Sequence, residues 1–590
     1  MSIVSLIQQA VAEELNGLYT LGIQPSDIQV TETKPEFEGD YTVVLFGLIK
    51  KLKMSPDALG NELGKRLHDN HPRLASAFNL IKGFLNLSVG DEYWRQFLIE
   101  QFNNDSYGRK PLSGKKALIE YSSPNTNKPL HLGHLRNNFL GWSIAEIFHF
   151  NGYETPKTCI ANDRGIHICK SMIAWQQFGN GATPESTGIK GDHLVGDFYV
   201  LFGAEHKKQV RELVGSGMPE ALAEKEAPIM KAAQQMLVDW EAGDPEVIDL
   251  WKKMNGWVYQ GFDATYKKIG SDFDKIYYES EVYLLGKKMV EEGIKKGVFF
   301  KKEDGSVWID LTQEGLDEKI VQRKDGTAVY ITQDIGLAAL KQEDFGADLN
   351  IYVVGNEQDY HFKVLKLIAQ KLDIKDAEGI HHLSYGMVEL PSGKMKTREG
   401  TVVDADEIVA EMEKIAEQKT QELGKVKDFT EQELTSLYAT IGLGALKFFL
   451  LRVDPKKKML FNPEESIDFQ GFTGPFIQYT YARTRSILRK EKPVGEKTTD
   501  PLLPAEKKLV IELERFGETI EKAGAEMDPS IIAGYVFTLA QAFNSFAAEL
   551  RILTAETPEK KELRLQLAQL TAYVIKTGMN LLGIGVPEKM

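Results

Sequence analysis

The sequence predicts a multidomain α/β protein in which a split, doubly wound parallel sheet lies between an α+β N-terminal domain and an all-α C-terminal bundle. Three observations support this prediction. Short apolar runs followed by helical patterns begin near residue 115, a charged and mostly helical stretch at about 176–300 interrupts them, and residues 404–590 show only helical periodicity. We therefore expect the two halves of the sheet on either side of an insertion, which carries the segment 190–199.

The expected strands are short and apolar. Residues 117–121 form an apolar run bounded by lysines and a Ser-Ser-Pro-Asn turn, a pattern typical of a buried parallel strand. Residues 135–150 then carry apolar side chains at helical spacing and end at an Asn-Gly pair. Beyond the insertion, the strands expected to resume the sheet, each followed by a helix, are 307–310, 328–331 and 351–354.

Turn residues divide the chain into domains. Residues 1–110 mix helices with short strands such as 41–45, and they end in two glycine-containing turns. The domain built on the sheet is expected at 111–400. The helical remainder is expected in two sections, 401–468 and 469–590.

The most informative segment, residues 124–134, reads Pro-Asn-Thr-Asn-Lys-Pro-Leu-His-Leu-Gly-His. It lies where the first strand leads into the first helix, at the carboxyl edge of the sheet, where open α/β folds bind nucleotides. Amides at a helix start favour phosphate, His131 and His134 offer further donors, and Gly133 lets a flat base approach the backbone. Taken alone, the pattern also fits histidines that only cap or pack against a helix.

A second segment, residues 393–400, reads Gly-Lys-Met-Lys-Thr-Arg-Glu-Gly and follows an expected strand at 387–390. Alone, it is also typical of a solvated basic loop. Together, in this order and at this interval, the two segments resemble the HIGH and KMSKS motifs of class I aminoacyl-tRNA synthetases.

The surrounding residues resemble one member of that class, the arginyl-tRNA synthetase family. The similar segments are 38–41, 83–86, 120–125, 325–334, 353–355 with Gln358 and His361, 474–485, 541–545 and 581–584. The resemblance therefore covers nearly the whole chain. It implies an additional tRNA-binding domain at 1–110, a Rossmann-like catalytic domain at 111–400, a stem-contact region at 401–468 and an anticodon-binding bundle at 469–590.

The resemblance implies that arginine is activated with ATP and Mg²⁺ to arginyl-adenylate and pyrophosphate, and is then transferred to the terminal adenosine of tRNA(Arg). Donors and cations must stabilise the phosphoryl charge in the first step. The implied catalytic residues are His131, Gly133, His134, Lys128, Lys394 and Lys396, and the implied ATP-binding residues are Pro124, His131, Gly133, His134, Met387, Lys394 and Met395. Thr397 stands where the second signature lysine is usual, and Lys128 resembles the lysine proposed to substitute for it.

A guanidinium presents only donors, so arginine recognition requires carboxylates. The implied arginine-binding residues are Glu120, Asn125, Tyr330, Asp334 and Gln358. Two simpler roles stay open. Glu120 also fits a helix cap or an ion pair with Lys128, and Asp334 also fits the N-cap of the next helix.

The segment 476–485 combines aromatic rings with arginines, as single-stranded bases require. The resemblance implies tRNA binding by Tyr479, Arg483 and Arg485. An aromatic stripe at helical spacing also fits a packed core, and Phe476 and Tyr481 belong to the same stripe.

Composition restricts the partners and the compartment. The formal net charge of −14 argues against bulk electrostatic attraction to nucleic acid, so RNA contacts require local basic patches. The only two cysteines, ten positions apart, supply neither a disulfide framework nor a thiolate zinc site, so no structural zinc and no metal-ligating residue is expected. We expect no signal peptide and no apolar stretch long enough to span a bilayer, hence a cytoplasmic protein. A monomer is expected by resemblance.

Two other classes of function are compatible with parts of the sequence. A tRNA-binding paralogue without turnover would keep the fold, but His131, His134, Lys394, Glu120 and Asp334 are all present. A small nucleotidyl transferase of the pantothenate-ligase type would share the first motif, but the long helical C-terminal half fits it poorly. Arginine-dependent pyrophosphate exchange separates these alternatives.

Overall fold

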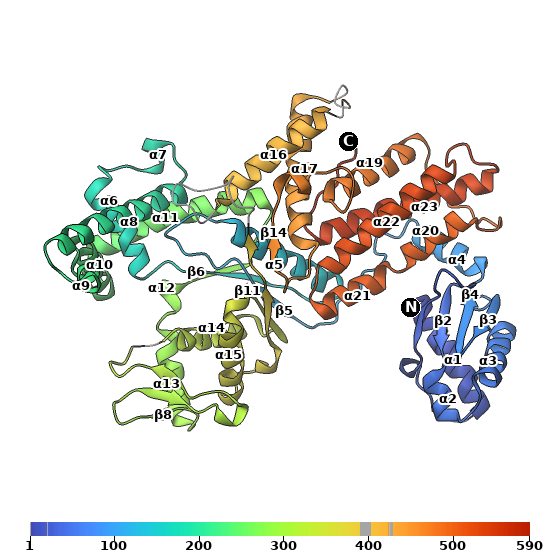
Figure 1. The fold of residues 1–590 in the computed structure, drawn as a ribbon, viewed down its shortest axis with the longest axis horizontal. Coiled ribbons are helices and arrows are strands. Elements are labelled where there is room, and N and C mark those ends of the chain that lie inside the picture. Colours follow the sequence, from blue (N-terminus) through green and yellow to red (C-terminus); the bar gives the residue numbers. More distant parts are fainter. Residues whose placement is uncertain (1, 20–21, 328, 390–402, 423, 425–428) are drawn as a thin grey trace.

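The computed structural model describes residues 2–19, 22–327, 329–389, 403–422, 424 and 429–590 (Figure 1). The N-terminal domain is a four-stranded antiparallel sheet, in the order β1-β2-β4-β3, with helices packed on it. Its elements are α1 (Ile3–Tyr19), η1 (Pro25–Asp27), β1 (Val30–Glu32), β2 (Tyr41–Val44), α2 (Phe46–Leu52), α3 (Pro56–Asn70), β3 (Ala77–Ile81), β4 (Phe84–Ser88) and α4 (Asp91–Gln101). The expected α+β class of this domain is confirmed.

The central sheet has five parallel strands in the order β12-β11-β5-β6-β7. They are β5 (Ala117–Glu120), β6 (Lys157–Ala161), β7 (Lys275–Tyr278), β11 (Leu349–Gly355) and β12 (Ile380–Tyr385). The direction of winding reverses between β5 and β11, which is the point where doubly wound sheets bind ligands beyond the strand ends. The predicted doubly wound sheet is confirmed, and the segment 124–134, which follows β5, begins at this point.

The sheet differs from the expectation in two respects. β7 lies inside the expected insertion of about 176–300 and forms the edge of the main sheet. Residues 329–331, the described part of the apolar run at 328–331, do not form a strand, because α14 (Tyr330–Phe345) begins within them. Ile331 and Ile335 are both buried at a spacing of one helical turn, so this β-branched run begins an amphipathic helix.

Residues 307–309 form a strand, as expected, but in a separate antiparallel sheet of the order β10-β9-β8. This sheet and the helices around it form a second insertion, between β7 and β11 of the central sheet. Its elements are α12 (Glu279–Val282), α13 (Leu285–Lys295), β8 (Phe300–Lys301), β9 (Val307–Ile309), η2 (Thr312–Glu314) and β10 (Lys319–Gln322). The chain returns through α14 to β11, then continues through η3 (Asn356–Gln358), α15 (Asp359–Lys371) and η4 (Ala377–Gly379) to β12.

The helical insertion follows β6. It comprises α6 (Ile166–Phe178), α7 (Pro184–Thr187), α8 (Gly191–Gly215), α9 (Glu220–Glu226), α10 (Pro228–Ala242) and α11 (Pro245–Ile269), at the left of Figure 1. α8 and α11 cross at close range, since a Cβ on Gly191 would lie 2.1 Å from the Trp257 carbonyl oxygen. Only glycine allows this approach of the two helices.

The C-terminal part is helical, as expected, apart from a short parallel pair formed by β13 (Val388–Glu389) and β14 (Met459–Leu460). Its helices are α16 (Ala405–Glu422), α17 (Glu431–Leu451), α18 (Pro463–Ser466), α19 (Gly474–Lys490), α20 (Pro504–Glu514), α21 (Phe516–Glu526), α22 (Ser530–Glu549) and α23 (Pro558–Leu581). Thr473 caps α19 and thereby begins the final bundle close to the expected position 469.

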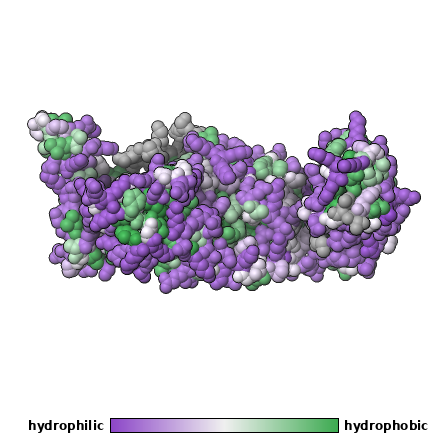
Figure 2. Space-filling view, turned by 90° about the horizontal axis from the view of Figure 1, so that it is seen from below, coloured by the Kyte–Doolittle hydropathy of each residue, from purple (hydrophilic) through white to green (hydrophobic). Residues whose placement is uncertain are grey.

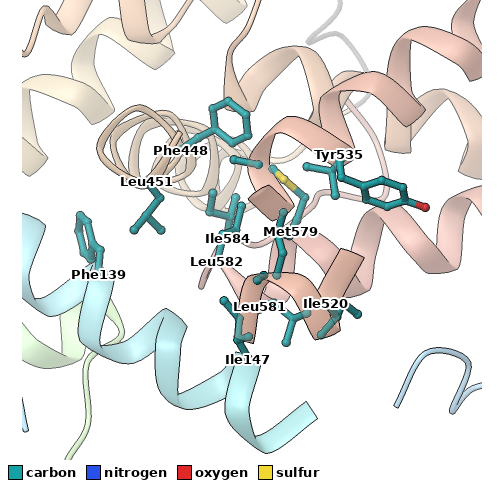
Figure 3. Close-up of a cluster of buried hydrophobic side chains, with 14 of the residues drawn as sticks. Phe139, Ile147, Phe448, Leu451, Ile520, Tyr535, Met579, Leu581, Leu582 and Ile584 are labelled. Carbon is teal, nitrogen blue, oxygen red and sulfur yellow. The ribbon is translucent and has the colours of Figure 1, made fainter. Parts of the chain in front are cut away.

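One hydrophobic core joins the central sheet to this bundle. α5 (Leu132–Phe150) contributes Phe139 and Ile147, which lie among Phe448 of α17, Ile520 of α21 and Leu581 of α23 (Figure 3). The helix that begins at the first candidate motif is therefore fixed at its far end by the C-terminal helices. The face of the molecule in Figure 2 is mainly hydrophilic, with hydrophobic residues in small separate areas.

Among the residues that the structure describes, two helices are long and apolar enough to cross a membrane, contrary to the expectation from the sequence. They are α17 and α22. In their most apolar windows, 61% of the α17 residues and 50% of the α22 residues are buried inside the protein. Core helices of soluble proteins pass the same test of length and composition, because an apolar helix is equally suited to a protein interior.

Candidate active site

The turn after β5 is held in a conformation that side chains rarely adopt. Ser122 and Ser123 have φ values of +76° and +48°, in the left-handed region. The buried amide of Asn137 on α5 supports this turn: its Oδ1 accepts from the Ser122 amide at 2.5 Å, and its Nδ2 donates to the Val353 carbonyl of β11 at 2.7 Å. Backbone strain of this kind persists only where surrounding contacts impose it, and it is concentrated at functional sites.

His131 and His134 lie together at the start of α5. His131 is the N-cap, and its ring centroid is 3.9 Å from that of His134. The His131 Nδ1 accepts from the Gly133 amide, and the His134 Nδ1 accepts from the His131 amide, each at 3.1 Å. The cap role considered from the sequence is therefore real, but it uses only one nitrogen of each ring.

Burial determines the protonation of both rings. It lowers the pKa of His131 to about 4, and it lowers the pKa of His134 well below the ordinary value; the nearby charge of Lys128 acts in the same direction. Both imidazoles are therefore neutral at pH 7. Because each Nδ1 accepts a backbone hydrogen bond, the single proton of each ring lies on Nε2, where it can be donated to a ligand.

Gly133 and Lys128 flank the two rings. A Cβ on Gly133 would lie 3.0 Å from His131 Cε1, so glycine leaves the His131 ring room beside the backbone. Lys128 is half-buried, and burial lowers its pKa. Upstream, Pro124 is buried and its carbonyl accepts from the Asn162 amide at 2.9 Å. These residues surround the helix start at which a phosphate is expected.

The chain on both sides of the second motif is attached to the first motif. Arg136 of α5 is fully buried and donates to the Gly386 carbonyl at 2.5 Å, just before Met387 and β13. On the other side, the Leu132 amide donates to the Val403 carbonyl at 3.1 Å. Met387 is half exposed, and within the strand expected at 387–390 the residues Val388–Glu389 form β13, while residue 390 lies outside the described residues. Lys394, Met395, Lys396 and Thr397 lie outside the described residues.

Glu120, at the end of β5, forms an ion pair with Lys341 of α14. The side chains of both residues are almost completely buried, at 8% and 1% exposed. The Lys341 ammonium also lies 4.7 Å from the centre of the Tyr352 ring, a cation–π contact. Glu120 does form an ion pair, as one of the simpler roles considered, but the predicted partner was wrong. The partner is Lys341 and not Lys128, because α14 lies against the end of β5.

Asp334 is the fifth residue of α14, whose N-cap is Val329, so the alternative role of Asp334 as an N-cap is wrong. Its carboxylate is partly exposed and contacts the His361 Nε2 at 2.6 Å. Tyr330, one turn earlier, is 78% exposed. Asp334 and Tyr330 therefore remain accessible to a ligand, as arginine binding requires.

Asn125 and Gln358 occupy equivalent positions after adjacent strands. Asn125 is exposed after β5 and forms a bridge with Asn162, while Gln358 is exposed at the end of η3, directly after β11. Both lie at the carboxyl edge of the sheet beside the switch point. The structure thus brings the predicted arginine-binding residues of β5, α14 and η3 to one edge of the sheet.

The aromatic segment 476–485 lies in α19. Tyr481 is buried and donates to Glu588, and Phe476 packs on Phe537, so these two rings belong to the core, as the simpler interpretation held. Arg485 donates to Glu588 at 2.7 Å, and Arg483 donates to Asn544 at 3.0 Å. Tyr479 is half-buried. Tyr479, Arg483 and Arg485 stay a prediction for RNA binding.

Three functional contacts were not predicted from the sequence. Lys341, Arg136 and Asn137 contact residues at least 15 positions away in the chain. The only available signal was their type, a charged or amide side chain among apolar neighbours on a helix. Cys159 and Cys169 are buried, and burial raises the pKa of both thiols to about 12, so both are protonated thiols at pH 7.

Comparisons with known proteins agree with this geometry. Residues 98–462 match the family of class I (R) tRNA synthetase catalytic domains, residues 477–590 match the DALR anticodon-binding domain, and residues 5–89 match the arginyl-tRNA synthetase N-terminal domain. The parallel sheet, the histidine pair and these matches define a class I aminoacyl-tRNA synthetase.

Comparison with individual relatives shows which family within this class the chain belongs to. The arginine–tRNA ligases of Amoebophilus asiaticus and Parabacteroides distasonis are 50% and 51% identical to the chain, with 100% of each sequence covered. The arginyl-tRNA synthetase structure from Thermus thermophilus is 26% identical, covers 99% of both chains and has a TM-score of 0.81. The chain belongs to the arginyl-tRNA synthetase family.

Proposed function

We propose that this chain is an arginine–tRNA ligase, which activates arginine with ATP, releases pyrophosphate and transfers arginine to the terminal adenosine of tRNA(Arg). Full-length similarity to arginine–tRNA ligases supports this activity. The observation that carries the mechanism is the pair of neutral imidazoles at the start of α5, each of which accepts a backbone bond at Nδ1 and keeps its Nε2–H for a phosphate.

In the activation step, the arginine carboxylate attacks the α-phosphorus of ATP and pyrophosphate leaves. Negative charge accumulates on the phosphoryl oxygens, and donors fixed before the reaction stabilise that charge most effectively. His131 and His134 would donate from Nε2, and Lys128, Lys394 and Lys396 would supply positive charge. Pro124, Gly133, Met387 and Met395 would line the ATP site.

Mg²⁺ would enter with ATP. The described residues around the histidine pair supply nitrogen donors and a lysine, whereas Mg²⁺ prefers oxygen ligands and commonly binds substrate phosphates. No side chain of this chain is therefore assigned to the metal.

Arginine would bind across the switch point. Glu120 and Asp334 would face the guanidinium together with Tyr330, while Asn125 and Gln358 would hold the amino and carboxylate groups. For tRNA, we propose Tyr479, Arg483 and Arg485 within the C-terminal bundle, with the N-terminal domain as an additional RNA contact. We further propose that the enzyme acts as a monomer in the cytoplasm.

Arginine-dependent exchange of pyrophosphate into ATP tests the proposed function directly. The assay is run with and without tRNA(Arg), and charging of tRNA(Arg) is measured in parallel. Exchange and charging specific for arginine are expected. A folded protein that binds tRNA(Arg) but catalyses neither reaction would instead be the non-catalytic paralogue considered above.

Replacing Asp334 by asparagine is expected to raise the KM for arginine about tenfold, which corresponds to about 1.4 kcal/mol. The reason is that an amide cannot match the charged hydrogen bond of a carboxylate to a guanidinium. The KM for ATP should change little, and discrimination against citrulline should fall. Asp344→Asn, which removes a charge at the far end of α14, is the matched control. A KM for arginine within about twofold of the parent would contradict the role of Asp334.

Replacing Lys128 by methionine tests how the missing signature lysine is compensated. Lys128→Met is expected to lower the exchange rate as much as Lys394→Met, because each removes one cation from the phosphates. Introducing the usual residue by Thr397→Lys should restore part of the activity of Lys128→Met. Steady-state kinetics at saturating arginine measure both effects. Full activity of Lys128→Met would exclude the idea that Lys128 takes the role of the missing signature lysine.

A further inference from the structure

A cluster of charged side chains joins the helical insertion to the chain that follows the second motif. The segment 190–199, which had no assigned role, contributes three of its members from the start of α8. We call the cluster the insert clamp, and its residues are Lys190, Asp192 and His193, Thr265 of α11, and Asp404 and Asp406 at the start of α16.

Lys190 is at the centre of the insert clamp. Its ammonium lies 2.7 Å from Asp406 Oδ2 and 3.1 Å from Asp192 Oδ2, and it also donates to the Thr265 hydroxyl. The His193 Nε2 lies 3.2 Å from Asp406 Oδ2 and 3.3 Å from Asp404 Oδ2. Asp192 is completely buried. Lys190 and His193 at the start of α8 therefore hold both aspartates of the 404–406 segment.

The 404–406 segment is in turn attached to the first motif. The Ala405 amide donates to the Leu130 carbonyl at 2.9 Å, and His131 and Asp404 form a β-bridge. Asp404 Oδ1 also accepts from the Asp406 and Glu407 amides, and thereby caps α16. These bonds place the backbone of His131 directly against the residues that the insert clamp holds.

α8 contacts the first motif at a second point. A Cβ on Gly196 would lie 2.9 Å from Pro129 Cδ and 3.6 Å from Lys128 Cα. The glycine thus allows α8 to rest against the residues just before His131. The start of α8 therefore contacts the residues just before His131 and, through the insert clamp, the 404–406 segment that pairs with His131.

The insert clamp already contains its own cation. The carboxylates of Asp192 and Asp406, with His193, bring possible metal-ligand atoms within 4.8 Å of one another. The Lys190 ammonium, however, bonds to both carboxylates and would repel a metal ion between them. The cluster is therefore best explained as an ion-paired connection between protein segments.

We propose that Lys190 and His193 are positioning residues for arginine activation: through Asp404 and Asp406 they fix the segment that holds the His131 backbone, so the insertion controls the placement of the phosphate-binding histidines. The proposal rests on the assignment of these histidines to ATP. It predicts that loss of the clamp impairs use of ATP and leaves arginine binding intact.

The first test is Lys190→Met, with Lys190→Arg as the conservative variant. Because small displacements of catalytic groups are costly, we expect kcat of pyrophosphate exchange to fall about tenfold to a hundredfold in Lys190→Met, with a higher KM for ATP and a KM for arginine within about twofold. Lys190→Arg should recover part of the loss. Lys268→Met, which breaks a separate ion pair between α11 and α16, is the matched control and should retain parental kinetics.

A purely structural role is tested by the double variant Lys190→Met/Asp192→Asn. It removes one charge of each sign and thus avoids leaving the completely buried Asp192 carboxylate without Lys190, while Asp406 keeps its contacts with His193 and Thr265. We expect its Tm to return toward that of the parent while kcat stays low. If kcat and the KM for ATP return with the Tm, the proposal is rejected. An inactive parent would instead reject the proposed function itself.

His193→Gln gives an independent measurement that does not depend on either Lys190 variant. The hydrogen bond to Asp406, with the charges of Asp404 and Asp192, raises the pKa of His193 against the effects of burial and Lys190. The contribution of a protonated His193 is complete at low pH and is lost as pH rises through the raised pKa. The ratio of parent to variant kcat is therefore expected to be largest at pH values below the ordinary histidine pKa of about 6.5 and to fall toward one as the pH rises through the raised pKa of His193. A ratio of one at every pH would overturn the role of His193.

Discussion

Replacing His134 by alanine is expected to slow arginine activation about 30-fold to 1,000-fold, which corresponds to about 2–4 kcal/mol of transition-state stabilisation. The substitution removes the Nε2–H donor, and it also removes the Nδ1 acceptor that holds the His131 amide. Both effects act on the charge that develops on the phosphoryl oxygens. The KM for arginine should change little, because the proposed arginine-binding residues lie on β5, α14 and η3.

The measurement is pre-steady-state formation of arginyl-adenylate at saturating ATP and arginine, with tRNA(Arg) present. His149→Ala, in the last turn of the same helix, is the matched control and should retain the parental rate. His134→Asn retains both an acceptor and a donor and should recover part of the loss. An unchanged rate in His134→Ala combined with weaker arginine binding would assign His134 to the wrong substrate.

Replacing Lys341 by methionine is expected to destabilise the protein by about 3–5 kcal/mol, because it leaves the Glu120 carboxylate buried without a counter-charge. Lys341 is almost completely buried and its ammonium pairs with Glu120, so solvent cannot compensate for the loss. The urea midpoint and the Tm of the variant measure the effect. Lys275→Met breaks the more exposed ion pair with Asp344 of the same helix and should cost less than about 1 kcal/mol.

The double variant Glu120→Gln/Lys341→Met separates stability from arginine binding. Removing both charges should restore most of the lost stability, since a neutral pair has no uncompensated charge. The KM for arginine should nevertheless stay at least about tenfold above that of the parent, because Glu120 is proposed to bind the guanidinium. If the double variant binds arginine as the parent does, Glu120 has a structural role only, as the partner of Lys341.

The sequence predicted the elements whose patterns are local. Residues 117–121 are apolar enough to be recognised as a buried strand, and the spacing of His131, Gly133 and His134 placed a phosphate site at the following helix start. The prediction from the sequence was wrong where the local preference of a segment differs from the conformation that tertiary packing imposes. The run at 328–331 has strand-forming residues but begins α14, because Ile331 and Ile335 bury one face of that helix. β7 was hidden in the insertion, since Lys275–Tyr278 begins with a lysine and buries only one residue, and so lacks the continuous apolar run of β5.

By itself, the sequence determined the fold class, the order of the domains and the two motifs, because these depend on residues close together in the chain. Only the tertiary structure decided which partner each charge has. Glu120 pairs with Lys341 rather than Lys128, Asp334 contacts His361 rather than capping a helix, and Lys190 reaches Asp406. Such pairs depend on how helices far apart in sequence pack against one another, and in a buried environment the nearest opposite charge in space is the one that stabilises the fold.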